Sequence, residues 1–172
     1  DLSERFRFLI KTTGAALAPF DSWLILRGIK TLGIRMEKAQ ENAVALVNWL
    51  KGQKAVTKVI YPGLPEHPGY AIMKKQARGF GAMITFRLKN REFALAILEK
   101  VRMIQFAESL GGVETLITYP ATQTHADVPQ ERRERNGITD RTLRLSVGIE
   151  DVKDLLDELD RVFAEIEGEQ HG

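Results

Sequence analysis

The sequence contains no cysteine, which excludes a disulfide framework, a thiol nucleophile and a thiolate metal site. Histidine is scarce as well, and His67, His125 and His171 are too scattered in the sequence to suggest a metal site. No apolar run is long enough to span a membrane, and no signal-peptide pattern is present. We therefore expect a protein of the reducing cytoplasm that binds no metal and no membrane.

An excess of charge of one sign is also missing, since 25 basic and 23 acidic residues give a net charge of +2. The densest basic run, Arg132, Arg133 and Arg135, is interleaved with Glu131 and Glu134. That mixture is typical of a solvated helical face and not of a stripe that follows nucleic-acid phosphates. The glycine patterns of nucleotide-binding loops do not occur either. We expect no nucleic-acid partner.

The first 51 residues are expected to be helical. Ser3 is a suitable N-cap for a short helix, and Asp21 for a much longer one that runs to Lys51 and ends at Gly52. At roughly 1.5 Å per residue, about 30 residues span about 45 Å, more than a small domain, so this helix is expected to link two bodies or to pack across a partner. Its apolar residues recur every four and three positions, as in a heptad seam: Ile25, Ile29, Leu32, Met36, Ala39, Ala43, Leu46 and Leu50.

Two glycines, Gly28 and Gly33, lie inside this expected helix, where each costs about 1 kcal/mol. They are either tolerated or mark the close approach of another backbone. The chain opens on Asp1 and not on Met, so we expect that the beginning of a longer protein precedes it.

Short strands and helices are expected to alternate after residue 52. The pattern predicts strands over residues 56–61, 82–88, 103–107, 114–118 and 142–147. It predicts helices over residues 70–76, from Asn90 as N-cap to 101, between Pro129 and Gly137, and over 151–167, with a frayed end at 168–172. Short strands joined by turns, with helices on one face, indicate the α+β class.

Residues 108–150 hold the polar side chains best suited to a site, because they lie at expected strand ends and glycine turns. Arg144 is the first candidate. It lies in a strand between Leu143 and Leu145, so its side chain points away from theirs. A guanidinium is a planar fork that binds a carboxylate through two hydrogen bonds. The alternative is a plain surface arginine on an open sheet face.

The residues around Ser109 offer weaker signals. The paired glycines that follow Ser109 can turn backbone N–H groups towards one point, as in an anion-binding concavity, although an ordinary turn explains them as well. Glu108 and Glu114 could be paired carboxylates, but exposure at strand ends explains both. His125 is expected to be structural, and no histidine is patterned as a base for Ser109, so a hydrolase triad has little support. Lys30 lies in the middle of the expected long helix without a desolvating pocket, which indicates a solvated lysine.

The chain resembles the pyridoxal-phosphate enzymes of cysteine and methionine metabolism, the family of the cystathionine synthases and lyases and of methionine γ-lyase. The matching runs are PFDSWL (19–24), RGIKTL (27–32), AESLGGVE (107–114), PATQTHA (120–126) and RLSVGIED (144–151). The spacing from Ser109 to Thr124 to Arg144 also fits the family pattern. The combination is specific to this family, although each run alone is not.

The resemblance implies that the chain is the small C-terminal domain of a fold-type I enzyme, with a mostly antiparallel sheet. Residues 1–51 would include the long interdomain helix, and residues 52–172 would form the C-terminal α+β domain. The larger domain that holds the cofactor would lie upstream of residue 1. The Schiff-base lysine would lie there too, so we expect no catalytic residue, no cofactor-binding residue and no activity in this chain alone.

The resemblance also implies roles for four residues. Arg144 would bind the α-carboxylate of a sulfur amino-acid substrate, Ser109 and Thr124 would line the site, and Glu108 would lie near the substrate side chain. The complete enzyme would perform β- or γ-elimination or γ-replacement at sulfur as a homotetramer built from dimers. The alternative is a stand-alone, non-catalytic module that binds an amino acid or mediates dimerisation, which the heptad seam and the missing catalytic lysine favour.

Overall fold

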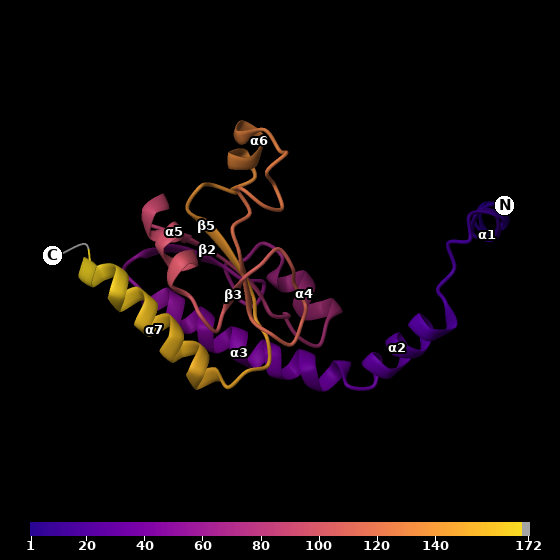
Figure 1. The fold of residues 1–172 in the computed structure, drawn as a ribbon, viewed down its shortest axis with the longest axis horizontal. Helices are drawn as coiled ribbons and strands as arrows, with labels where there is room; N and C mark the ends of the chain where they lie inside the picture. Colours follow the sequence, from indigo (N-terminus) through magenta and orange to yellow (C-terminus); the bar gives the residue numbers. More distant parts are fainter. Residues whose placement is uncertain (170–172) are drawn as a thin grey trace. The chain divides into compact units, whose positions relative to one another are not determined.

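The structure is a computed structural model that describes residues 1–169. Its elements in chain order are α1 (Leu2–Thr13), α2 (Pro19–Ile29), α3 (Leu32–Gly52), β1 (Val56–Ile60), α4 (Tyr70–Gln76), β2 (Met83–Leu88), α5 (Arg91–Lys100), β3 (Gln105–Phe106), β4 (Leu116–Thr118), α6 (Gln130–Arg135), β5 (Thr142–Ser146) and α7 (Val152–Glu169) (Figure 1). The chain forms two compact units, Asp1–Ile34 and Arg35–Gly172.

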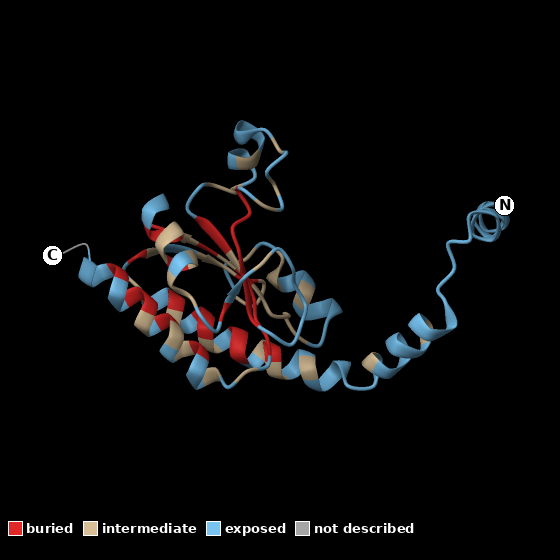
Figure 2. Cartoon of the chain, viewed as in Figure 1, coloured by how far each residue is buried: buried red, intermediate tan, exposed pale blue. Residues whose placement is uncertain are grey.

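The first unit contains α1 and α2, and none of its residues is buried (Figure 2). The N-cap of α1 is Asp1, whose side chain accepts a hydrogen bond from the backbone N–H of Ser3. The prediction that Ser3 caps this helix is therefore wrong. An aspartate one position before the helix fills the same role, because its carboxylate also meets the positive end of the helix.

The single helix predicted from Asp21 to Lys51 is also wrong, because the chain forms α2 and α3 with a break at Lys30 and Thr31. The backbone N–H and the hydroxyl of Thr31 both donate to the carbonyl of Gly28, which competes with the helical hydrogen-bond ladder. An added Cβ at Gly28 or Gly33 would meet no atom within 4 Å, so no other backbone of the first unit approaches them closely.

The second unit is built on a mixed five-stranded sheet with the strand order β1-β2-β5-β4-β3. Three of its pairings are antiparallel, and β3 pairs with β4 in parallel. The α+β class is confirmed. Each strand that we expected is present but shorter, most of all between residues 103 and 107, where only Gln105–Phe106 forms a strand.

The helices expected in this unit are present as well. Asn90 caps α5 through a hydrogen bond from the backbone N–H of Phe93 to its side-chain oxygen at 2.9 Å, as predicted. The last helix, α7, continues through Gly168 and Glu169, which we expected to be frayed. We also expected residues 170–172 to be frayed, but they lie outside the described residues. Whether residues 1–51 and 52–172 are separate domains of a larger enzyme stays a prediction.

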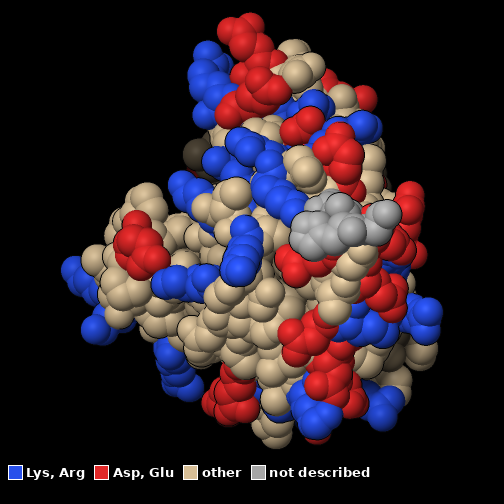
Figure 3. Space-filling model, turned by 90° about the vertical axis from the view of Figure 1, so that its left-hand side faces the viewer, with Lys and Arg blue, Asp and Glu red and all other residues tan. Residues whose placement is uncertain are grey.

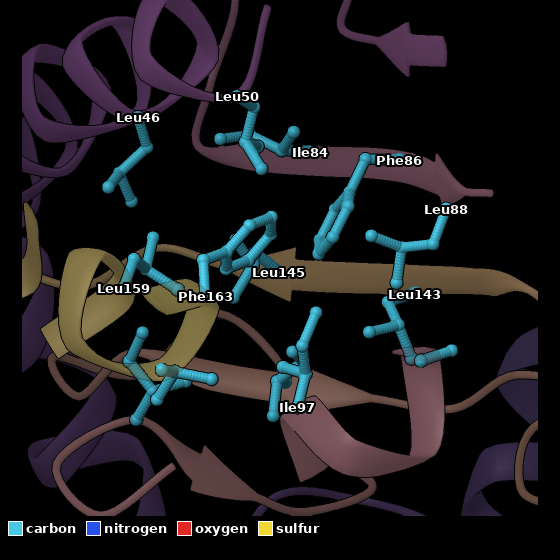
Figure 4. Close-up of a cluster of buried hydrophobic side chains, with 14 of the residues drawn as sticks. Leu46, Leu50, Ile84, Phe86, Leu88, Ile97, Leu143, Leu145, Leu159 and Phe163 are labelled. Atoms are coloured by element: carbon cyan, nitrogen blue, oxygen red, sulfur yellow. The ribbon is translucent and has the colours of Figure 1, made fainter. Parts of the chain in front are cut away.

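A single core joins one face of the sheet to α3, α5 and α7 (Figure 4). Trp49 of α3 and Phe93 of α5 both pack edge-on against Phe163 of α7, with ring centroids 4.8 and 5.1 Å away. The Trp49 indole N–H donates to Asp160 at 2.7 Å, which satisfies its polar end. Only the second half of the predicted heptad seam is buried, and its buried residues are Ala39, Ala43, Leu46 and Leu50.

The turn between α5 and β3 is held by a carboxylate of α7. Glu158, whose side chain is 9% exposed, accepts hydrogen bonds from the backbone N–H groups of Arg102 and Met103 and pairs with Arg161 at 2.8 Å. Burial of the Glu158 carboxyl favours its neutral form, but the hydrogen bonds from Arg161 and the two backbone groups outweigh this, and its pKa is lowered.

Neither a membrane span nor a metal cluster is found in residues 1–169. No helix there combines the length and apolar character needed to cross a membrane. No group of three or more His, Asp or Glu side chains there could hold a metal ion. Figure 3 shows side chains of both charge signs on the face that it presents.

Candidate functional site

Arg144 lies in the middle of β5, between two neighbouring strands. Leu143 and Leu145 are fully buried in the core, so Arg144 points to the opposite face of the sheet, as predicted. Its partners in the sheet register are Thr85 on β2 and Thr118 on β4. Two rigid strands therefore flank the guanidinium stem on the face that the core helices do not cover.

Thr118 and Ser109 hold one nitrogen of the guanidinium. Nη2 of Arg144 donates to the Thr118 hydroxyl at 3.2 Å and, in a long hydrogen bond of 3.5 Å, to the carbonyl of Ser109. The Thr118 hydroxyl in turn donates to the carbonyl of Ala107 at 3.0 Å. Thr118 is buried, so its one proton and its lone pairs are committed to Ala107 and Arg144, which fixes the direction of the guanidinium.

Nε of the Arg144 guanidinium has no acceptor among residues 1–169. Nε is buried and makes no hydrogen bond, and Arg144 forms no ion pair with any residue from 1 to 169. A buried donor without a partner destabilises a protein by about 1–3 kcal/mol, more for a charged group. A carboxylate placed beside this guanidinium would supply both the missing charge and an acceptor, which a solvated surface arginine does not need.

One backbone N–H of the turn after Ser109 is not available for the anion-binding concavity that the glycines allowed. Gly111 has a positive φ of 80°, and its backbone N–H donates to the Ser146 hydroxyl at 2.8 Å. That N–H is therefore used within the protein and is not offered to a ligand. The bond ties the turn to the end of β5, two residues from Arg144, and brings Ser109 to the guanidinium through its carbonyl.

A buried polar network fixes the end of β5 behind this turn. Thr115 donates to the Glu150 carboxylate at 2.8 Å and accepts from the backbone N–H of Gly148 at 2.9 Å. The amide of Asn42 donates to the carbonyls of Gly148 and Glu150 at 3.1 and 2.8 Å. A Cβ at Gly148 would lie 2.2 Å from the carbonyl oxygen of Val113, so this close approach requires glycine.

Among the described residues, the other two predicted site residues form no hydrogen bond or ion pair with Arg144. Thr124 is exposed in the loop after β4, where its hydroxyl shares a hydrogen bond of 2.8 Å with Nδ1 of His125. Tyr119 anchors this loop, because its hydroxyl donates to the carbonyl of Asp140 at 2.6 Å. Glu108 is exposed beside Ser109 and takes part in none of the hydrogen bonds or ion pairs between the described residues. Their roles in substrate binding stay predictions.

Sequence reasoning missed Thr118 and Ser146, which orient Arg144 and its turn. Both are on strands, and both are buried. The pattern of β4 gave no reason to single out Thr118, because its value depends on the register that places it opposite Arg144. Knowledge of the strand pairing would have identified it.

All lysines among residues 1–169 keep contact with solvent. No lysine from residue 1 to 169 is buried, and Lys30 is exposed at the end of α2. A lysine that reacts as a free amine at neutral pH usually requires desolvation or a neighbouring cation. The guanidinium of Arg144 instead suits the carboxylate of a substrate.

Comparison with known proteins assigns this chain to a family. Residues 1–164 match the family model described as "Cys/Met metabolism PLP-dependent enzyme". Cystathionine beta-lyase of Coxiella burnetii is 50% identical over 160 residues, which are 92% of this chain and 41% of that protein. Cystathionine gamma-lyase of Bacillus subtilis is 46% identical over 166 residues, 96% of this chain and 44% of that protein.

A solved structure shares the fold. The crystal structure of cystathionine gamma-lyase from Lactobacillus plantarum, complexed with L-serine, matches with a TM-score of 0.87 and 45% identity over 96% of this chain and 44% of that one. The chain thus spans about two fifths of the length of the curated relatives it matches, 41% and 44% for the two above. The cofactor that the description of the family names is pyridoxal phosphate.

Proposed function

This chain belongs to the pyridoxal-phosphate-dependent enzymes of cysteine and methionine metabolism, and from that premise we propose that it supplies the substrate-carboxylate clamp of a trans-sulfuration enzyme. The reaction would be a β- or γ-elimination or a γ-replacement on a sulfur amino acid. The names of its relatives, cystathionine lyases, support this substrate class.

The observation that carries the proposal is the guanidinium of Arg144. It is oriented by Thr118, lies on the face of the sheet opposite the core, and keeps a buried N–H without a protein acceptor. Bound to Arg144, the α-carboxylate of a substrate would be held in one orientation, which aligns the bonds at Cα with the reacting group. Ser109, Thr124 and Glu108 would complete the substrate side of the site.

Pyridoxal phosphate supplies the electron-withdrawing chemistry in this family when it is bound. We propose that the lysine that carries it belongs to a part of the protein outside these 172 residues, and that this chain alone is inactive. A cytoplasmic homotetramer is the assembly that we propose for the complete enzyme. An absorbance scan with pyridoxal phosphate, followed by borohydride reduction and intact-mass measurement, should reveal no stoichiometric lysine adduct on this chain. A single stoichiometric adduct would contradict this part of the proposal.

The test of the clamp is Arg144→Ala in the complete enzyme. Removal of one partner of a buried, hydrogen-bonded charge pair costs about 2–5 kcal/mol, and kcat/KM for cystathionine should fall accordingly. Arg144→Lys keeps the charge without the planar fork and should recover only part of the loss. Arg141→Ala, at an exposed arginine beside the same strand, is the matched control. Unchanged kinetics in Arg144→Ala would overturn the assignment.

A stand-alone module remains the second candidate, because the first unit exposes large apolar side chains such as Phe6, Phe20 and Trp23. Apolar surfaces of this kind commonly mediate association. This candidate predicts that the 172-residue chain self-associates in dilute solution. A monomeric mass at every concentration in sedimentation measurements would count against dimerisation through these side chains.

A further inference from the structure

A cavity of about 340 Å³ lies beside β1 and the loop that follows it, and it shares no residue with the Arg144 site. Its polar lining consists of Lys58, Glu66, His67, Arg87 and Asn136. This volume falls within the range of about 300–1,000 Å³ that small-molecule sites occupy. The cavity opens on β1, which is the edge strand of the sheet.

Two cations that line this cavity, Lys58 and Arg87, form no ion pair within the described part of the chain. Lys58 and Arg87 are direct partners in the register of β1 and β2, so their side chains share one face of the sheet. Like charges directly opposite each other are destabilising. Neither side chain forms an ion pair with another residue of the described part of the chain. An anion bound between them would relieve this repulsion.

Arg87 is held in place for such a role. Its Nη2 donates to the carbonyl of Gly137, and its Nε is buried without an acceptor. Gly137 has a φ of 82°, and a Cβ there would lie 2.4 Å from Nη2 of Arg87. Glycine at this turn therefore allows the guanidinium to approach the backbone, while an N–H donor of the same group stays unsatisfied.

The cavity lining also contains a negative charge, the carboxylate of Glu66. Glu66 lies 3.5 Å from Lys51, and a backbone hydrogen bond, with help from Lys51, keeps its pKa below the ordinary value. Nδ1 of His67 accepts from the backbone N–H of Gly69 at 3.0 Å, which leaves Nε2 as the donor of the neutral ring. The cavity thus offers cationic donors, one carboxylate and, from Val59, Leu64 and Pro68, apolar surface.

We propose that this cavity binds a free α-amino acid with an apolar side chain such as that of methionine. The α-carboxylate would lie between Lys58 and Arg87, the α-ammonium group would meet Glu66, and the side chain would contact Val59, Leu64 and Pro68. With a simple anion, Glu66 would keep Lys51 as its only cationic partner among the described residues, and an apolar amine would leave both cations unpaired. This site does not depend on the function proposed for Arg144.

The test is a calorimetric titration of the 172-residue chain with L-methionine, which should saturate with one ligand per chain. Lys58→Gln and Arg87→Gln should each weaken binding at least tenfold, whereas Lys54→Gln, at an exposed lysine outside the cavity lining, should leave it unchanged. Arg87→Gln also removes the hydrogen bond to the carbonyl of Gly137 and could disturb that turn. Lys58 makes no hydrogen bond to Gly137, so a loss of binding in Lys58→Gln cannot be explained in this way. No saturable heat at about 10 mM methionine, well above a millimolar dissociation constant, would overturn the proposal.

Matched probes separate the two ends of the ligand. 4-(Methylthio)butanoate lacks the ammonium group, so it should bind more weakly than methionine and should not respond to Glu66→Gln, while methionine should. Equal binding of methionine and inorganic phosphate would mean an anion site only and would overturn the amino-acid assignment. Loss of methionine binding in Arg144→Ala would place the ligand at Arg144 instead, which would support the clamp and contradict this site. If methionine bound to this chain but not to the complete enzyme, the cavity would be covered in the complete enzyme. That result would also overturn the proposal.

Discussion

The two units of the chain are both rich in apolar residues, but only one of them buries these residues. In Asp1–Ile34, Trp23 is 54% exposed and Phe20 is 66% exposed. In the second unit, Leu46, Phe86 and Leu145 are fully buried. The difference is the sheet: α3, α5 and α7 of the second unit pack on apolar strand faces, whereas α1 and α2 have no such surface among the residues of their own unit. Most of the stability of a helix in a protein comes from packing its apolar face against a partner surface.

The largest loss of stability is expected in the second unit, from Leu145→Ala in the central strand β5. Removal of a buried leucine side chain should lower the free energy of unfolding by about 2–5 kcal/mol, because the surrounding core collapses only in part. Denaturant unfolding of the 172-residue chain measures it. A loss below about 1 kcal/mol would mean that the second unit lacks a tightly packed core.

A smaller loss is expected from Thr118→Val, which keeps the shape of the side chain and removes the hydroxyl between Arg144 and Ala107. Two partly buried polar groups, the carbonyl of Ala107 and Nη2 of Arg144, lose the hydroxyl as a partner, so the free energy of unfolding should fall by about 1–3 kcal/mol. In the complete enzyme, the KM for the amino-acid substrate should rise because Arg144 is no longer oriented. Thr118→Ser retains the hydroxyl and should restore both properties; if it does not, the hydrogen bonds are not the cause.

Glu158→Gln should cost about 1 kcal/mol at pH 7, since a hydrogen bond to an ionised group is replaced by a neutral one. The folded pKa of Glu158 lies below its ordinary value of 4.5, so its stabilising contribution is complete above that value and is lost as the pH falls through the folded pKa. The gap between wild type and variant should therefore close in acid. Glu167→Gln, at an exposed glutamate, is the control, and a gap that persists at low pH would contradict the argument.

The smallest effect is expected in the first unit. Leu24 is 44% exposed, so Leu24→Ala should change the free energy of unfolding of this chain by less than about 0.5 kcal/mol. The loss of stability caused by Leu24→Ala should also be measured in the complete enzyme and compared with the loss in this chain. A loss of about 2 kcal/mol or more there would mean that other parts of the protein bury this helix.

Short-range patterns predicted much of the second unit. The Asn90 cap and the apolar stripe of α7 depend on residues within one or two turns of each other, so local spacing is sufficient to identify them. The direction of Arg144 followed from the alternation of Leu143 and Leu145 for the same reason. The break at Thr31 was missed because the heptad spacing of the apolar residues continues across it, while a local hydrogen bond to Gly28 ends the helix.

The sequence by itself thus determined the α+β class, most of the elements and the residue at the centre of the candidate site. Only the tertiary structure decided what surrounds that residue. Thr118 meets Arg144 because β4 and β5 pair in one register, and Lys58 meets Arg87 because β1 and β2 do. Register depends on contacts between residues distant in the sequence, and a shift of one residue would turn every side chain of a strand to the other face.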